Sequence, residues 1–154
     1  MSDRVLNTRQ LNRALLARQL LLERSSGSLT DVLEQIGGLQ TQYAPSGYIG
    51  LWSRMHDFER PMLTRALEER RAVQGTLMRV TIHTVSAADY WPMALALRRP
   101  RRAWWLGATR HAVGEADMVE VARVIRQALA NGPRRQSELA GLLRDRGFPS
   151  AAWQ

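Results

Sequence analysis

The stretch AVQGTLMRVTIHTVS, residues 72–86, decides the fold. Its β-branched residues alternate with others, as in extended strands, whereas the segments on either side repeat apolar residues at helical spacing. The stretch predicts either two short strands that meet around residues 75–78, or one strand whose partner lies upstream. In both interpretations a small β element interrupts a chain of helices.

Four helices are predicted before this stretch. Apolar residues at helical spacing indicate a long amphipathic helix over residues 8–24 and a second helix that Ser28 would cap. Gly37 is expected to end the second helix in the left-handed conformation. A third helix is predicted around residues 48–55, and Pro61 suits the first turn of a fourth.

Helices are expected again after the β element. Ser86 can cap the next helix, and the arginine- and proline-rich residues 98–114 are expected to form a linker because they break the periodicity. Beyond them, residues 115–133 predict an amphipathic helix, and residues 134–149 resemble the second helix of a helix-turn-helix. A third helix would then begin at residues 150–154.

Short helices followed by a β-hairpin are the order of a winged helix-turn-helix. We therefore expect a mainly α fold with a small β-hairpin, in which residues 1–112 form a first winged-helix domain. Residues 113–154 would form an incomplete second winged-helix domain, since no hairpin follows its helices. The 154 residues are accordingly expected to be a fragment of a longer protein.

The charge of the chain narrows the choice of partner. There are 22 basic residues against 14 acidic ones, a net charge of +8, and every basic residue is arginine. Such an excess favours nucleic acid before membrane, because neutralised phosphates release counterions. A GC-rich genome would enrich arginine in the same way, so charge alone leaves the partner open.

Several other functions are disfavoured by the composition. The chain has no cysteine, and its three histidines lack metal-ligand spacing, so neither a metal nor another cofactor is expected. No apolar run approaches the ~20 residues that span a bilayer, and the N-terminus lacks the apolar core of a signal peptide. We expect a cytoplasmic, nucleoid-associated monomer that does not bind membranes.

Two glutamines, Gln40 and Gln42, flank Thr41 just after the predicted helix end. Side chains at i and i+2 diverge by about 200° on a helix but point to the same side of an extended segment. The two amides can therefore converge only if the segment after Gly37 is extended. Two glutamines after a helix can equally well satisfy backbone groups of a loop, and spacing alone does not choose between these interpretations.

Three stretches, LNRALLARQLLLER (11–24), GLQTQYAPSGYIGLWSR (38–54) and LMRVTIHTVSAADYWPMALALRRP (77–100), resemble the AlkZ/YcaQ family of bacterial DNA glycosylases in order and spacing. The resemblance implies tandem winged-helix domains followed by a β-barrel, and excision of alkylated bases, including interstrand crosslinks. It implies that Gln40 and Gln42 are catalytic. Glutamine rather than aspartate at position 42 makes the chain similar to the AlkZ branch, which is associated with crosslink unhooking. The chain departs from the family in length.

Amide side chains suit the chemistry that this resemblance implies. An alkylated purine is already cationic and leaves as a neutral base, so it needs little acid assistance. Amide carbonyls can hold a water and favour positive charge on the sugar without titrating. A glutamine cannot act as a general base near neutral pH, so any proton acceptor must come from elsewhere in the protein or from bulk water.

Other residues are expected to contact DNA. Tyr43 is a candidate for contacting an extruded nucleotide. Arg79 and His83 share a strand face and would lie near the cleft or a phosphate, although His83 can equally well bond to backbone at the base of the hairpin. A run of four arginines could grip the DNA backbone or form a solvated linker: Arg98, Arg99, Arg101 and Arg102.

The leading hypothesis is therefore a monofunctional DNA glycosylase that acts on duplex DNA containing alkylated purines. The alternative hypothesis is a non-catalytic winged-helix transcriptional regulator, which would bind one DNA sequence selectively through the helix near residues 48–55 and release no base. A third possibility is an inert fragment whose basic surface binds acids unselectively.

Overall fold

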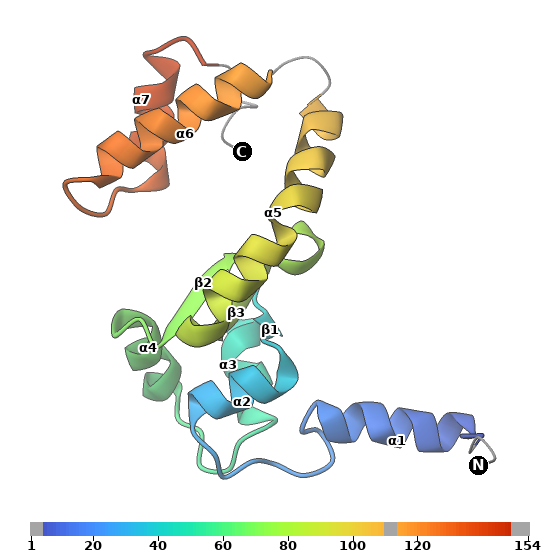
Figure 1. The fold of residues 1–154 in the computed structure, drawn as a ribbon. Helices are drawn as coiled ribbons and strands as arrows, with labels where there is room; N and C mark the ends of the chain where they lie inside the picture. Colours follow the sequence, from blue (N-terminus) through green and yellow to red (C-terminus); the bar gives the residue numbers. More distant parts are fainter. Residues whose placement is uncertain (1–4, 110–113, 149–154) are drawn as a thin grey trace. The chain divides into compact units, whose positions relative to one another are not determined.

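The computed structural model describes residues 5–109 and 114–148 (Figure 1). Within these ranges the chain is mainly helical with one small antiparallel sheet, as the sequence predicts. Contacts divide the chain into two compact units, Met1–Arg98 and Arg99–Gln154. The domain boundary predicted at residues 112–113 lies outside the described residues and stays a prediction. None of the helices described is both long and apolar enough to cross a bilayer.

The first unit contains most of the elements. In chain order they are α1 (Thr8–Arg18), α2 (Leu29–Ile36), β1 (Leu39–Gln40), α3 (Pro45–Trp52), α4 (Arg60–Glu68), β2 (Ala72–Thr76), a 3₁₀ turn (Met78–Val80) and β3 (Ile82–Ser86). Helix α5 (Ala87–Thr109) begins in the first unit and continues into the second, which also holds α6 (Glu115–Leu129) and α7 (Gln136–Arg144). The four helices predicted before the β element are therefore present.

Helix α1 is shorter than the predicted helix over residues 8–24. It ends early because Leu20 takes the left-handed conformation, with φ of 55°. The N–H groups of Leu20 and Leu21 then donate to the carbonyls of Ala17 and Leu16 at 3.0 and 2.9 Å, which is a Schellman ending. Glycine is usual at this position, so a leucine there is no visible stop signal. None of the side chains of α1 is buried.

Helix α2 begins and ends as the sequence predicts. The Ser28 hydroxyl accepts a hydrogen bond from the N–H of Asp31 at 3.2 Å, which caps the helix. Gly37 ends it in the left-handed conformation, with φ of 72°. Gly38, with φ of 88°, then donates its N–H to the carbonyl of Leu33 at 2.8 Å. These two glycines turn the chain from the helix into β1.

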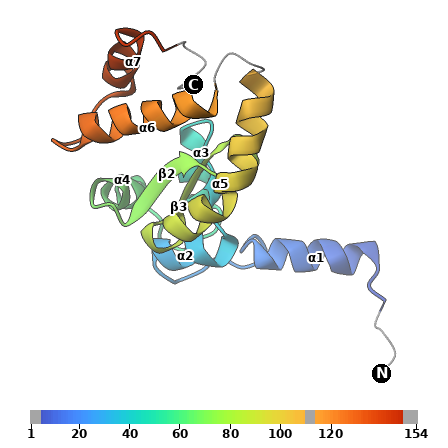
Figure 2. The same ribbon diagram turned by 45° about the horizontal axis from the view of Figure 1, so that its top comes forward.

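The sheet has the order β1-β3-β2, with both pairs antiparallel. Both interpretations of residues 72–86 are therefore correct in part, because β3 pairs with its hairpin partner β2 and also with the upstream strand β1. The hairpin turn lies at Met78–Val80 rather than at residues 75–78, because Gly75 pairs with His83 within the ladder. Figures 1 and 2 show the first part of α5 lying across one face of this sheet.

The core of the first unit packs three helices against the end of β2. Its buried side chains come from α2, from α3 and the turn after it, from α4 and from β2: Leu29, Val32, Leu33, Leu51, Met55, Leu63, Ala66 and Ala72. Leu20, which ends α1, also packs against this core. The core thus holds α2 and α3, the two helices on either side of β1, in fixed positions.

The linker predicted over residues 98–114 is wrong for residues 98–109, because these continue helix α5. The prediction relied on proline as a helix breaker. Pro100 removes one backbone donor, but alanine, leucine and arginine around it are strong helix formers. Ser86 caps the start of α5 as predicted, since its Oγ accepts from the N–H of Asp89 at 3.1 Å.

The second unit contains the two helices predicted after residue 114. They pack on one another through Val121 and Val124 of α6 and Leu143 of α7, all buried. Gly147, with φ of 78°, ends the last turn as predicted. The helix predicted at residues 150–154 lies outside the described residues.

The two glycines before β1 offer a matched test of this connection. An added Cβ at Gly38 would lie 2.5 Å from Val85 Cγ1, whereas at Gly37 nothing lies within 4 Å. We expect Gly37→Ala to lower the free energy of unfolding by about 1 kcal/mol, the cost of a left-handed non-glycine residue. Gly38→Ala should lower it by about 2–4 kcal/mol, because overpacking adds to that cost. Urea unfolding monitored by circular dichroism measures both; equal losses would contradict the close approach.

Candidate functional site

Strand β1 brings Gln40 next to His83. The pairing of β1 with β3 sets Gln40 directly opposite His83, and the Thr41 N–H extends the ladder by donating to the Ile82 carbonyl at 2.8 Å. The segment after the helix end is therefore extended through Thr41, as convergence of the two amides requires. Gln40 and His83 form a non-hydrogen-bonded pair, the arrangement in which cross-strand side chains approach most closely.

The opposite face of the sheet is closed by a hydroxyl network and by α3. The hydroxyls of Thr41 and Thr84 lie 3.0 Å apart, and the Gln74 amide donates to Thr84 at 3.1 Å. An added Cβ at Gly47 of α3 would lie 3.1 Å from the Thr41 methyl group, and one at Gly50 would lie 3.0 Å from Leu39. This packing fixes Thr41 facing inward, so Gln40 faces the other side.

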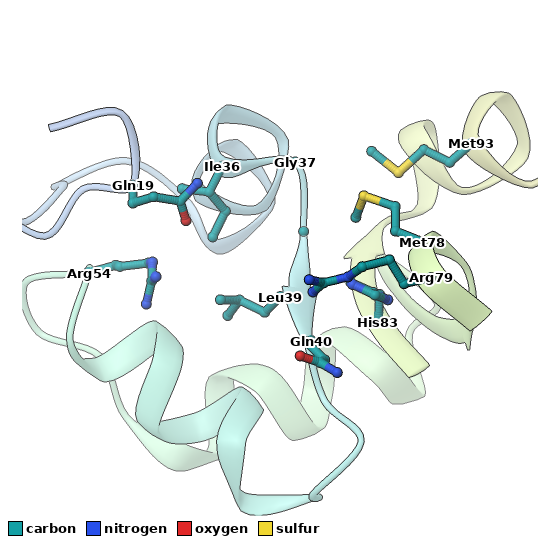
Figure 3. A pocket seen from close by; sticks show the side chains of 11 residues that line it. Gln19, Ile36, Gly37, Leu39, Gln40, Arg54, Met78, Arg79, His83 and Met93 are labelled. Atoms are coloured by element: carbon teal, nitrogen blue, oxygen red, sulfur yellow. The ribbon is translucent and has the colours of Figure 1, made fainter. Parts of the chain in front are cut away.

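Gln40 lines an open pocket of about 680 Å³ in the first unit (Figure 3). The pocket wall carries three further groups that can hydrogen-bond a polar ligand through a charged or ring nitrogen: Arg54, Arg79 and His83. Figure 3 shows Arg54 and Leu39 on one side of β1 and Arg79 and His83 on the other. Apolar side chains complete the wall: Ile36, Leu39, Met78 and Met93. The lining holds two cations and no carboxylate.

Gln42 is held differently from Gln40. Its side-chain Oε1 accepts a hydrogen bond from the N–H of Ile82 at 3.0 Å, at the place where the Thr41 carbonyl would accept in a regular ladder. It is not among the residues that line the pocket. The Gln40 amide, by contrast, has no hydrogen-bond partner among the described residues. The interpretation in which a glutamine hydrogen-bonds a backbone group of the loop therefore applies to Gln42.

His83 is buried, with 3% of its surface exposed, and still lines the pocket. Its Nδ1 lies 2.9 Å from the Thr81 carbonyl. The backbone bond predicted at the base of the hairpin is thus present, whereas the place of His83 near a catalytic cleft or a phosphate stays a prediction. On the other side of His83 the ladder has Gly75, where an added Cβ would lie 2.7 Å from the Tyr90 ring.

Arg79 reaches the pocket from a strained turn. Arg79 and Val80 both have positive φ, 54° and 59°, and the Thr81 N–H donates to the Met78 carbonyl at 3.2 Å. Two left-handed residues in this position make a type I′ turn, which Asn-Gly usually occupies. A β-branched valine there is a genuine outlier, and such strain is concentrated at functional sites.

Arg54 was not singled out by the sequence analysis. Its guanidinium donates to the carbonyl of Gly50 and to the hydroxyl of Ser53, at 2.9 and 3.1 Å, and so caps α3. Its Nε is sealed from solvent and has no partner in the described part of the chain, and burial lowers the pKa of this guanidinium. The available signal was its place at the end of a predicted helix, where a cation suits the free carbonyl groups.

The remaining predicted DNA contacts lie elsewhere. Tyr43, immediately after the glutamine pair, is 71% exposed. Of the arginine run, Arg98 ends the first unit and is exposed, while the others belong to the second unit. Arg99 is exposed, whereas Arg101 and Arg102 are half-buried. Within residues 5–109 and 114–148 no group of three or more His, Asp or Glu side chains is placed to hold a metal ion.

The different anchoring of the two glutamines gives a stability prediction. Gln42→Leu should lower the free energy of unfolding by about 0.5–1.5 kcal/mol, because it removes the acceptor of the Ile82 N–H. Gln40→Leu should change it far less, since the Gln40 amide makes no such bond. Gln42→Glu serves as the control because it keeps an acceptor oxygen. Urea unfolding of the three variants measures the difference; a larger loss in Gln40→Leu would contradict this assignment.

Comparisons with known proteins place the chain in a family. The family model described as DNA glycosylase AlkZ-like matches residues 33–154. No curated protein matches. Among solved structures, the DNA glycosylase AlkZ of Streptomyces sahachiroi is similar, with a TM-score of 0.73 and 20% sequence identity over 90% of this chain. The match covers 40% of that protein, so this chain spans less than half of its length. The chain belongs to the AlkZ-like DNA glycosylase family.

Proposed function

We propose that the protein is a DNA glycosylase that hydrolyses the N-glycosidic bond of alkylated purines, including those joined in interstrand crosslinks. The observation that carries the proposal is the Gln40 amide, which lines the pocket unpaired on an extended strand, in a chain of a DNA glycosylase family. Gln40 is exposed, so water satisfies its amide in the free protein and can give way to a bound ligand. We infer that a ligand or an attacking water takes that place.

Gln40 is proposed to orient the water that attacks C1′ of the sugar. Its carbonyl dipole can accept a hydrogen from that water and also favour the positive charge that develops on the sugar. The amide does not titrate, so both interactions persist over a wide pH range. The alkylated purine already carries its positive charge and leaves as a neutral base, so the reaction needs little help at the leaving group.

Gln42 is proposed to support the same water from a fixed position. The bond from the Ile82 N–H uses one lone pair of Oε1, and the second remains available to a water. A side chain that is already held loses less rotamer freedom when the substrate binds. This interpretation unites the structural bond with the catalytic role that the family resemblance implies.

We further propose that the first unit is a winged helix that binds duplex DNA. Its order of α2, β1, α3, α4, β2 and β3, with the sheet order β1-β3-β2, supports this. The net charge of +8 supports a polyanionic partner. Tyr43 and Arg79 are proposed to contact the damaged nucleotide and its phosphate, and the exposed Arg98 and Arg99 the backbone.

A non-catalytic regulator is the second candidate, and the same order of elements favours it. It would bind one DNA sequence selectively and release no base. A glycosylase would instead bind sequences alike and prefer damaged DNA. Two measurements on the full-length protein separate the two functions: binding to a library of undamaged duplexes, and release of bases from alkylated duplex.

The catalytic assignment predicts a loss of base release without a loss of DNA binding. In the full-length protein, Gln40→Ala should slow release of N7-alkylguanine from alkylated duplex by about 100-fold or more, a typical cost of removing one positioned dipole. Gln42→Ala should slow it too, with the small stability loss given above. Chromatography of the released base measures the rate. Unchanged rates in both variants would contradict the catalytic role of the pair.

The proposed backbone contacts predict a change in salt dependence. Arg98→Gln and Arg99→Gln should each reduce the slope of log K against log salt by about 0.9 in magnitude, the value for one phosphate contact with duplex DNA. Fluorescence anisotropy over a salt series measures this slope. An exposed arginine of α4, in the variant Arg65→Gln, offers a comparison within the same unit. Unaltered slopes in the first two variants would favour a solvated surface.

A further inference from the structure

The amide pair leaves one requirement of the proposed reaction unmet, and His83 is placed to meet it. A water that attacks C1′ must lose a proton, and a glutamine cannot take it near neutral pH. Among the described residues that line the pocket, His83 is the one whose side chain has a ring nitrogen lone pair that can accept a proton. It stands directly across the ladder from Gln40.

The hydrogen bond of His83 fixes the form of its ring. Nδ1 lies 2.9 Å from the Thr81 carbonyl, and a carbonyl oxygen can only accept, so Nδ1 must carry the proton. In the neutral ring, the lone pair therefore resides on Nε2. A backbone acceptor that orients an imidazole in this way is the usual arrangement for a base whose other nitrogen is free to act.

The Nε2 atom of His83 is neither paired nor sealed. It has no hydrogen-bond partner in the described part of the chain. Among the described residues that are not exposed, a single side-chain nitrogen or oxygen is both inaccessible to solvent and without a hydrogen-bond partner, and that atom is Arg54 Nε rather than His83 Nε2. His83 Nε2 therefore keeps contact with solvent although the residue is 3% exposed, and the pocket that His83 lines supplies that contact.

The neighbours of His83 leave this lone pair free for a water. Gly75, its other cross-strand partner, has no side chain, and the Tyr90 ring from α5 occupies that space. The charged groups in the pocket lining are Arg79, from the hairpin turn, and Arg54, from the end of α3. Neither guanidinium can accept a hydrogen bond. The described lining contains no carboxylate and no other histidine, so it holds no competing acceptor for the proton.

We propose that His83 is the proton acceptor of the reaction, an inference that rests on the proposed glycosylase function. As the water oxygen bonds to C1′, one of its protons passes to Nε2 of His83. The C1′–N bond breaks, and its electron pair goes to the departing base, which loses its positive charge. The products are a sugar with a C1′ hydroxyl, a neutral alkylated base and an imidazolium that returns its proton to solvent.

The variant His83→Asn tests this role in the full-length protein. The asparagine amide can still donate to the Thr81 carbonyl, but it has no basic nitrogen. We expect release of N7-alkylguanine at neutral pH to fall by about 100-fold or more. The wild-type rate should fall in acid, as for any reaction that needs a basic group, whereas the residual rate of His83→Asn should not depend on pH in that range.

Controls separate this role from folding and from DNA binding. His56 is exposed and does not line the pocket, so His56→Asn should keep the wild-type rate and pH profile. Affinity for a duplex with an abasic-site analogue, and the urea midpoint, should be unchanged in His83→Asn. If that variant does not fold, the rate of base release by His83→Gln and the pH profile of the wild type are measured instead.

The outcomes distinguish this inference from the proposed function. A wild-type protein that releases no base contradicts the glycosylase function itself. If base release by the wild type is lost in Gln40→Ala but His83→Asn releases the base as fast as the wild type, the role of His83 alone is overturned. A wild-type rate with no fall on the acidic side also overturns it. A loss of affinity equal to the loss of rate would show that His83 serves binding.

Discussion

The pairing of the short strand β1 with β3 is the constraint on which the site depends. Two residues of ladder and the bond from the Thr41 N–H to the Ile82 carbonyl set Gln40 beside His83. That pairing requires the backbone at Gly38 to approach β3 so closely that an added Cβ would lie 2.5 Å from Val85 Cγ1. A one-residue slip would turn Gln40 to the other face of the sheet. The hydroxyl of Thr41, bonded to that of Thr84, opposes such a slip because it would become an unpaired buried group.

Local signals in the sequence were sufficient for most of the helices, whereas the extended form of the segment after Gly37 entered only as a condition for the two amides to converge. Ser28 and Ser86 cap helices, and Gly37 ends one, because each acts on backbone groups within a few residues. The structure places Gln40 on the extended segment β1. Its neighbour in space could not be predicted, because the pairing of β1 with β3 joins residues about forty positions apart and periodicity carries no information on such pairs.

The wrong predictions have a common physical origin. Tertiary packing overrides the local conformational preference of a residue at these positions, and the backbone there is strained. Leu20 is left-handed at the end of α1 and packs against the core, and Arg79 and Val80 form a turn that usually needs Asn-Gly. Pro100 lies inside α5, where proline usually ends a helix. At these positions the residue types disagree with the backbone they adopt. The left-handed hairpin turn, whose residue types do not suit its backbone, lies at the pocket, and it brings Arg79 into the pocket wall.

The absence of carboxylates from the described lining follows from the charges around it. A carboxylate at position 40 would share the pocket with Arg79, and an ion pair between the two would lower the basicity of the carboxylate and hold it away from a water. An amide forms no ion pair and keeps its dipole in any protonation state. A neutral imidazole likewise does not attract a guanidinium, and the bond from His83 to Thr81 keeps its free nitrogen in one orientation. Under the proposed mechanism, arginines that contact phosphate can thus lie beside an amide that orients a water, because an amide carries no charge.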